Sequence, residues 1–152
     1  MTREVEVEQL PAQDVLAVRR EVSMATIGTA MDSAFGALWR HVAQTGAQPA
    51  GPPLVLYLEP PEGEFTIEVC VPVAANAVGA EGIDVQHLPA TEAATLVHHG
   101  PYDGLSASWQ QLGDWVRGSG RTAGGPAREV YVTDPRGCAP EDLRTQLVIP
   151  LT

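Results

Sequence analysis

The residues best placed to do chemistry are Glu129 and Tyr131, two positions apart in a short apolar run. A Gly-Gly-Pro turn precedes the run and an Asp-Pro pair follows it, which predicts a β-strand. Alternate side chains of a strand share a face, so we expect Glu129, Tyr131 and Thr133 on one face and Val130 and Val132 on a core face. A carboxylate beside a phenol within a strand indicates the floor of a ligand site. The alternative is that Glu129 faces water, as most glutamates do.

Other reactive side chains fit structural roles better. His98 and His99 are adjacent on a predicted strand and point to opposite faces, so they do not share a metal ion, and we predict no metal and no cofactor. Ser106 and Ser108 fall on a predicted helix without the strained turn of a serine nucleophile. Glu68 alternates with apolar residues of another predicted strand and could reach a ligand, although a solvent position is the stronger expectation. We assign no catalytic residue.

The elements that position these residues form two similar series. Strands are predicted over residues 3–10, 14–22, 54–59 and 64–73, and again over 83–88, 91–99, the Glu129 run and 144–151. One helix begins near Gly28 and another after Tyr102. Their apolar positions follow the same i, i+4, i+7, i+11 spacing, namely Met31, Phe35, Leu38 and Val42 in the first and Leu105, Trp109, Leu112 and Val116 in the second.

The two series also match residue by residue. Leu10-Pro11-Ala12 recurs as Leu88-Pro89-Ala90, an offset of 88 − 10 = 78. Four further matches follow in sequence order, with offsets of 74 to 78: Trp39 with Trp115, Gly51-Pro52 with Gly125-Pro126, Tyr57 with Tyr131, and Val71-Pro72-Val73 with Ile149-Pro150-Leu151. The chain is therefore predicted to be a tandem repeat with halves of about residues 1–75 and 82–152.

This repeat predicts the fold class. We expect an α+β domain over residues 1–152, built from tandem β-α-β-β modules with antiparallel sheets, two helices, a pseudo-twofold axis and a central cleft. In the first half, Val55 takes the place of Glu129, and Tyr57 takes the place of Tyr131. Because a structural role alone does not require this asymmetry, the repeat favours a position for Glu129 in the cleft.

Composition and charge exclude several classes of function. The formal net charge of −10 repels nucleic-acid phosphates, and all nine basic residues are arginine, which rules out lysine Schiff-base chemistry. An acidic surface favours cations instead. No apolar run approaches the roughly 20 residues that span a bilayer, and the N-terminus lacks the apolar segment of a signal peptide. We expect a cytoplasmic protein that binds neither membranes nor nucleic acid directly.

Several of these motifs together resemble the GyrI-like effector-binding domain. They are His98 to Leu105, Leu112 with Trp115, Gly125-Pro126 with Glu129 and Tyr131, and Thr145 with Ile149-Pro150-Leu151. The resemblance covers nearly the whole chain. It implies two modules about a pseudo-twofold axis, with a ligand cleft between them and a carboxylate, here Glu129, that neutralises bound cations. The chain carries no winged-helix or helix-turn-helix segment, so the resemblance is to a free-standing member.

In such domains aromatic residues surround the ligand, and the matching candidates are Tyr57, Tyr102, Tyr131 and Trp109, with Val55 on the opposite wall. The expected function is the binding of hydrophobic, aromatic and often cationic small molecules, for sequestration or sensing in drug resistance. One alternative is hydrolysis of cyclopropane-bearing natural products, with Glu129 as general base and Tyr131 or Tyr57 as proton donor. Another is interaction with gyrase through the acidic row Glu4, Glu6 and Glu8, which a solvated edge strand explains equally well.

Overall fold

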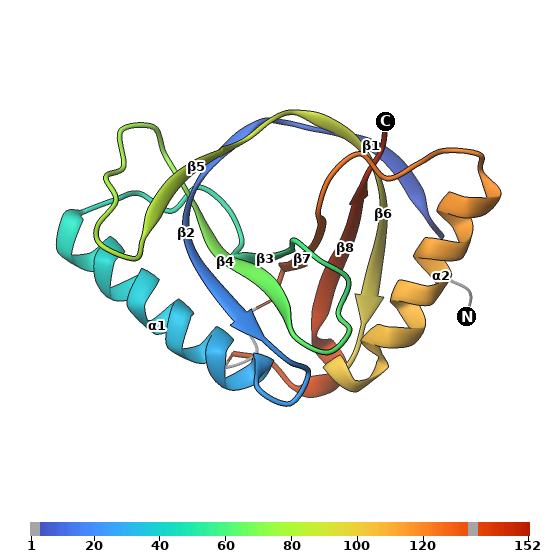
Figure 1. Ribbon diagram of the computed structural model, residues 1–152, viewed down its shortest axis with the longest axis horizontal. Helices are drawn as coiled ribbons and strands as arrows, with labels where there is room; N and C mark the ends of the chain where they lie inside the picture. Colours follow the sequence, from blue (N-terminus) through green and yellow to red (C-terminus); the bar gives the residue numbers. More distant parts are fainter. Residues whose placement is uncertain (1–3, 134–136) are drawn as a thin grey trace. The chain divides into compact units, whose positions relative to one another are not determined.

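The computed structural model describes residues 4–133 and 137–152, which form two compact units. Unit 2 is residues 12–89, and unit 1 combines residues 1–11 with residues 90–152. Each unit contains an antiparallel sheet with a helix along one face (Figure 1). The predicted α+β class with antiparallel sheets and two helices is confirmed. The pseudo-twofold axis and the cleft stay predictions.

Unit 2 has four strands in the spatial order β3-β4-β2-β5. Its elements are β2 (Gln13–Val22), α1 (Ile27–Thr45), β3 (Leu54–Tyr57), β4 (Phe65–Val73) and β5 (Asp84–Leu88). Helix α1 ends where Gly46 takes a left-handed conformation (φ 72°) and donates its N–H to the carbonyl of Val42. A residue without Cβ adopts this conformation at no steric cost.

Unit 1 has four strands in the spatial order β1-β6-β8-β7. Its elements are β1 (Glu6–Leu10), β6 (Thr91–His99), the 3₁₀ turn η1 (Tyr102–Gly104), α2 (Leu105–Gly118), β7 (Ala127–Tyr131), the 3₁₀ turn η2 (Pro140–Asp142) and β8 (Arg144–Pro150). The predicted elements are therefore present with small shifts of their ends. The predicted strand start at Arg3 and the Asp134-Pro135 stop lie outside the described residues.

Strand pairing confirms the tandem repeat. In unit 2, Val55 of β3 pairs with Val69 of β4, and in unit 1 Glu129 of β7 pairs with Leu147 of β8. These are the partners expected from offsets of 129 − 55 = 74 and 147 − 69 = 78. The β2–β4 and β6–β8 pairs share one register in the same way. The two sheets thus have one pairing pattern that carries two different sets of side chains.

The compact units do not coincide with the contiguous halves of the repeat. Strand β1 comes from the first half but pairs with β6 in unit 1, and β5 comes from the second half but pairs with β2 in unit 2. The chain passes from one unit to the other at Pro11-Ala12 and at Pro89-Ala90, the same point of the repeated Leu-Pro-Ala sequence. Each half therefore gives its first strand to the sheet of the other half.

The helices align with an offset of 74, which corrects one sequence match. Buried positions correspond as Ala34 with Ser108, Leu38 with Leu112 and Val42 with Val116 (108 − 34 = 74). Trp39 and Trp115, matched in the sequence at 76, are therefore not equivalent, and each is 37% exposed. The residue equivalent to Trp109 is Phe35.

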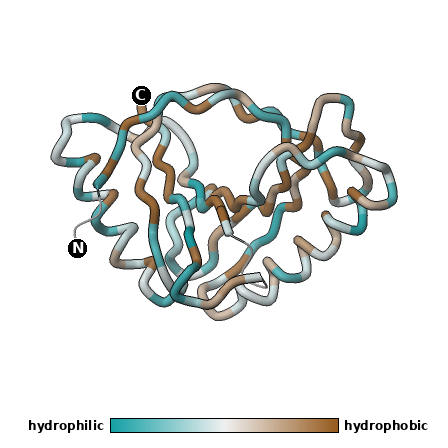
Figure 2. Tube along the Cα trace, turned by 180° about the vertical axis from the view of Figure 1, so that it is seen from behind, coloured by the Kyte–Doolittle hydropathy of each residue, from teal (hydrophilic) through white to brown (hydrophobic). Residues whose placement is uncertain are grey.

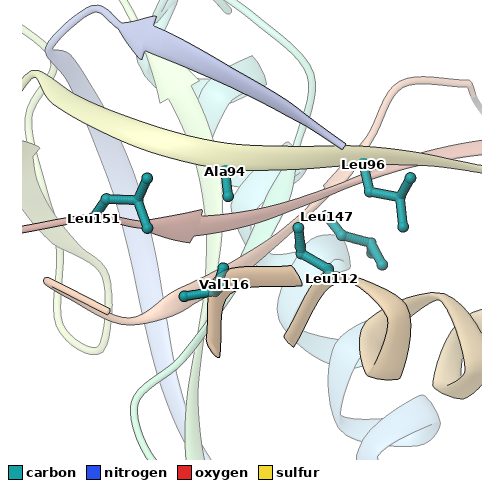
Figure 3. Packing of buried hydrophobic residues seen from close by; sticks show 6 residues of the cluster. All are labelled: Ala94, Leu96, Leu112, Val116, Leu147 and Leu151. Carbon is teal, nitrogen blue, oxygen red and sulfur yellow. The ribbon is translucent and has the colours of Figure 1, made fainter. Parts of the chain in front are cut away.

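The core of unit 1 lies between α2 and its sheet. The cluster contains Ala94, Leu96, Leu112, Val116, Leu147 and Leu151, with side chains of α2 opposite those of β6 and β8 (Figure 3). Fully burying a leucine or valine side chain contributes about 1.5–3 kcal/mol. The strands of both units carry long hydrophobic stretches, drawn brown in Figure 2. Within the described part of the chain, no helix is long and apolar enough to cross a bilayer.

A carboxylate pair in unit 2 makes stability depend on pH. The pKa of Glu21 is raised above its ordinary value of 4.5, because its side chain hydrogen-bonds to Glu64 and the negative charge of Glu64 repels its ionised form. The folded protein therefore binds this proton more tightly than the unfolded chain, and the stability that the proton confers is lost as pH rises above 4.5 through the raised pKa.

We expect Glu21→Gln to raise the melting temperature at pH 7, where it removes the repulsion. The gain should shrink as pH falls through the raised pKa of Glu21, because protonated Glu21 no longer repels Glu64. Thermal unfolding of the wild type and the variant across this range measures the effect, with the exposed Glu62→Gln as control. A gain that is equal at both ends of the range contradicts the assignment.

Candidate functional site

Glu129 lies on the helix-covered face of unit 1. Its pairing partner Leu147 packs in the core beneath α2, and paired residues of antiparallel strands point to the same face. Glu129 is only 6% exposed, so it does not face water. The expected valine core face is wrong, since Val132 is 49% exposed and Val130 is only partly buried. The carboxylate is thus more buried than either of these valines.

Two aromatic side chains hold the carboxylate. The indole Nε1 of Trp109, on α2, donates to Oε2 of Glu129 at 2.7 Å, and the hydroxyl of Tyr131 donates to Oε1 at 2.8 Å. Both donors are neutral, so they satisfy the oxygens without cancelling the charge. Among the described residues, no arginine or histidine forms an ion pair with Glu129 within 4.0 Å. The site therefore keeps a buried negative charge without a protein cation.

A third aromatic residue extends this site toward solvent. Tyr102, in η1, meets the ring of Tyr131 edge to face, with ring centroids 6.1 Å apart. Tyr102 is 39% exposed, whereas Trp109 and Tyr131 are partly buried. The structure therefore brings together four of the six predicted site residues: Glu129, Tyr131, Trp109 and Tyr102.

The other two predicted residues lie in unit 2. Tyr57 ends β3, and its ring stacks on Phe65 with centroids 6.2 Å apart. Val55, two positions earlier, is fully buried. Their participation in the ligand site stays a prediction.

Unit 2 contains an uncharged version of the same arrangement. At the positions of Trp109, Glu129 and Tyr131 it has Phe35, Val55 and Tyr57. The residue that donates to the carboxylate and the carboxylate itself are replaced together by apolar side chains. Since both units form the same sheet and helix, the carboxylate and its indole donor are not needed for the fold.

Two buried polar residues near this site were not predicted. His98 on β6 is 5% exposed and contacts Ser108 of α2, which is also 5% exposed. Thr145 of β8 is fully buried, pairs with Tyr131 on one side and with His98 on the other, and its hydroxyl makes no hydrogen bond with any described residue. The sequence signal for Thr145 was its place in the family resemblance, which assigned it no role.

Glu68 is also buried, contrary to the solvent position expected. It is 3% exposed, accepts a hydrogen bond from Gln86 Nε2, and lies 3.6 Å from the guanidinium of Arg19. Unit 1 has the same pair of residue types with their strands exchanged: the glutamine, Gln146, is on β8, and the glutamate, Glu8, is on β1, 3.5 Å away. Glu68 is thus already neutralised by Arg19, unlike Glu129.

The acidic row of β1 is not continuous in the structure. Glu8 turns toward its own unit, where it also accepts a hydrogen bond from Thr95. Glu4 and Glu6 stay exposed. A solvated edge strand with one inward carboxylate accounts for this row.

A surface depression of about 570 Å³ lies in unit 2 and contains none of the predicted site residues. It is broad and open, and its wall is formed by the end of β2, the start of α1 and Glu64: Arg20, Glu21, Val22, Ser23, Ala25, Thr26, Thr29, Ala30 and Ser33. Few apolar or aromatic side chains line it, in contrast to most small-molecule pockets. The aromatic enclosure of Glu129 is the better candidate.

The class of protein is that of the small-molecule binding domains. A family model for the GyrI-like small molecule binding domain matches residues 3–152, and the chain belongs to this family. A search of curated proteins finds no match.

Three solved proteins share the fold. The C-terminal domain of EcmrR is 22% identical, with a TM-score of 0.83 over 100% of this chain and 99% of that domain. In an EcmrR–DNA complex the identity is 20% and the TM-score 0.87, and this chain spans 57% of the longer protein. A hydrolase encoded by lin2189 from Listeria innocua is 15% identical (TM-score 0.67, 99% and 92% coverage). SAV2435 bound to tetraphenylphosphonium is 13% identical (TM-score 0.64, 98% and 94% coverage).

The contrast between the units predicts non-additive effects on stability. Trp109→Phe removes the donor to a buried carboxylate oxygen and should destabilise the protein by about 1–3 kcal/mol. Trp109→Phe with Glu129→Val copies the side chains of unit 2 and should cost less than the sum of the two single changes. Denaturant unfolding measures all three variants, with Trp115→Phe as control. Strictly additive costs contradict the assigned coupling.

Proposed function

We propose that this domain binds hydrophobic, aromatic small molecules, preferentially cations, next to Glu129 in unit 1. The observation that carries the proposal is the burial of this carboxylate without a protein cation. Its two donors, Trp109 and Tyr131, satisfy hydrogen bonds but leave a full negative charge. A bound cation supplies the missing opposite charge, and the burial that makes an unpaired charge costly also strengthens the attraction.

The aromatic rings favour the same class of ligand. The faces of Tyr102, Tyr131 and Trp109 can each contribute about 0.5–2 kcal/mol to a bound cation through cation–π contacts. Large flat rings recognise the charge and size of a ligand more than a particular hydrogen-bonding pattern, so ligand selectivity should be broad. Because Glu129 is 6% exposed, a ligand reaches it only when one of these rings moves aside, and the exposed Tyr102 is the outermost of them.

The relatives support this class of ligand without assigning it. SAV2435, of the same fold, has been solved with tetraphenylphosphonium, a lipophilic cation. EcmrR carries the same fold in a complex with DNA. We infer that this chain serves as a sequestering or sensing domain for such molecules, in drug resistance and in the cytoplasm, without direct contact to nucleic acid or membrane.

Glu129→Gln should weaken the binding of tetraphenylphosphonium about tenfold or more, because it removes the charge and keeps the shape. Isothermal titration calorimetry measures the affinity. Triphenylphosphine oxide, a neutral aromatic probe, should be affected much less. Glu62→Gln, which removes an exposed charge, controls for net charge. An equal loss for the neutral and the cationic probe overturns the assigned role of Glu129.

A second candidate function is hydrolysis of a strained cyclopropane ring. The observation that favours it is the 2.8 Å hydrogen bond between Tyr131 and Glu129, which joins a proton donor to a general base. The shared fold with a hydrolase adds only weak support at 15% identity. For gyrase interaction no feature of the described residues adds support, and a supercoiling assay tests it directly.

Turnover and binding are separated by product analysis. A hydrolase converts many equivalents of a cyclopropane-bearing compound into its ring-opened hydrate, and Glu129→Gln abolishes this conversion. A binding domain leaves the compound intact and retains at most one equivalent for each site. Multiple turnovers that persist in Glu129→Gln contradict the general-base assignment.

A further inference from the structure

We propose that His98 is a positioning residue that holds Trp109 against Glu129 and Tyr102 against Tyr131. The ring of His98 makes two hydrogen bonds at opposite ends. Its Nε2 lies 2.8 Å from the carbonyl oxygen of Pro101, and its Nδ1 lies 2.8 Å from the hydroxyl of Ser108. Pro101 directly precedes Tyr102, and Ser108 directly precedes Trp109. One imidazole therefore holds the residue next to each aromatic residue, through the backbone carbonyl of Pro101 and the side-chain hydroxyl of Ser108.

The tautomer of the neutral ring follows from these partners. A carbonyl oxygen only accepts, so Nε2 carries the hydrogen and donates to Pro101. Nδ1 then presents a lone pair and accepts the hydroxyl hydrogen of Ser108. The ring thus uses both nitrogens in different roles, and a substitute side chain reproduces only one of them.

The absence of a side chain at Gly104 leaves room for the imidazole ring of His98. A Cβ atom at this position would lie 3.0 Å from Cε1 of His98, tighter than ordinary van der Waals contact. Gly104 immediately precedes α2 and follows Tyr102 by two residues. A larger residue would therefore displace the imidazole and the start of the helix together.

Unit 2 shows that the contacts of His98 with Pro101, Gly104 and Ser108 are not required by the fold. At the positions of His98, Gly104 and Ser108, unit 2 has Arg20, Ala30 and Ala34. Unit 2 nevertheless forms the same sheet register and packs α1 on β2 and β4. The histidine clamp, defined as His98 with Pro101, Gly104 and Ser108, occurs in the unit that carries the Trp109–Glu129 bond.

Burial decides against a catalytic reading of the same pair. A serine hydroxyl that donates to a histidine resembles a nucleophile with its base. Both side chains are 5% exposed, however, and the hydroxyl of Ser108 is directed to the ring and away from solvent. The pair therefore serves to position its neighbours.

The experiment separates the two ends of the ring. His98→Gln places an amide nitrogen near Nε2 and keeps a donor for Pro101, but it loses the acceptor for Ser108. Ser108→Ala removes the same bond from the other side. Both variants should loosen Trp109. Gly104→Ala displaces the ring without removing a polar group, and Gly118→Ala, whose Cβ meets nothing within 4 Å, is the matched control at the far end of α2.

The first readout does not depend on a ligand. With Trp39→Phe and Trp115→Phe as background, Trp109 is the sole indole, since the sequence has three tryptophans. We expect the fluorescence emission of Trp109 to shift to longer wavelength, and its quenching by acrylamide to increase, in His98→Gln, Ser108→Ala and Gly104→Ala. The circular dichroism spectrum of each variant should remain that of the folded protein. Unchanged quenching in folded variants overturns the proposal, and a changed Gly118→Ala control does so as well.

The second readout rests on the proposed function and uses tetraphenylphosphonium. Ser108→Ala should weaken binding about three- to tenfold, but it should cost nothing more in a Trp109→Phe background, because Ser108 acts through Trp109. An equal loss in both backgrounds overturns the positioning role. If the wild type binds no tetraphenylphosphonium, the proposed function fails, and the fluorescence result alone decides the role of His98.

Discussion

The structure of the site depends on one buried negative charge that is hydrogen-bonded but not neutralised. Glu129 receives one donor from the helix and one from its own strand, and both donors are aromatic. Hydrogen bonds of this kind make burial of a carboxylate tolerable, and they leave its attraction for a cation in place. Glu68 shows the other solution, since a guanidinium and an amide satisfy it within its own unit. The two carboxylates are buried to a similar extent, and only Glu129 retains an uncompensated charge.

The order of the elements could be predicted because it depends on local sequence. Alternation marked the strands, glycine and proline marked the turns, and the i, i+4, i+7 spacing marked both helices. The exchange of β1 and β5 could not be predicted. The two halves repeat the same pattern, so by sequence the first strand of either half fits the edge of either sheet. Only the three-dimensional structure shows that β1 pairs with β6 and β5 with β2.

The candidate site was predictable where the repeat exposed a difference. The contrast between Glu129 and Val55 pointed to the carboxylate, and the family resemblance added Trp109 and Tyr102. The solvent position expected for Glu68 is wrong, and no burial is predicted for His98, because the burial of both depends on residues elsewhere in the sequence: Arg19 with Gln86 for Glu68, and Ser108 for His98. The Trp39–Trp115 match is wrong because it rests on residue type alone. The spacing of buried positions along the two helices instead aligns Trp109 with Phe35.

The duplicated architecture explains how such a site is compatible with a stable fold. The backbone pairing and the aliphatic contacts between helix and sheet recur in both units, and they do not involve the carboxylate. Unit 2 fills the equivalent positions with phenylalanine and valine, whereas unit 1 fills them with tryptophan and glutamate. A single change to glutamate would leave a buried acceptor without its donor, and a single change to tryptophan would add a donor without its acceptor. The two substitutions are therefore physically linked, and the binding chemistry follows from a paired polar replacement within a framework that the other unit keeps apolar.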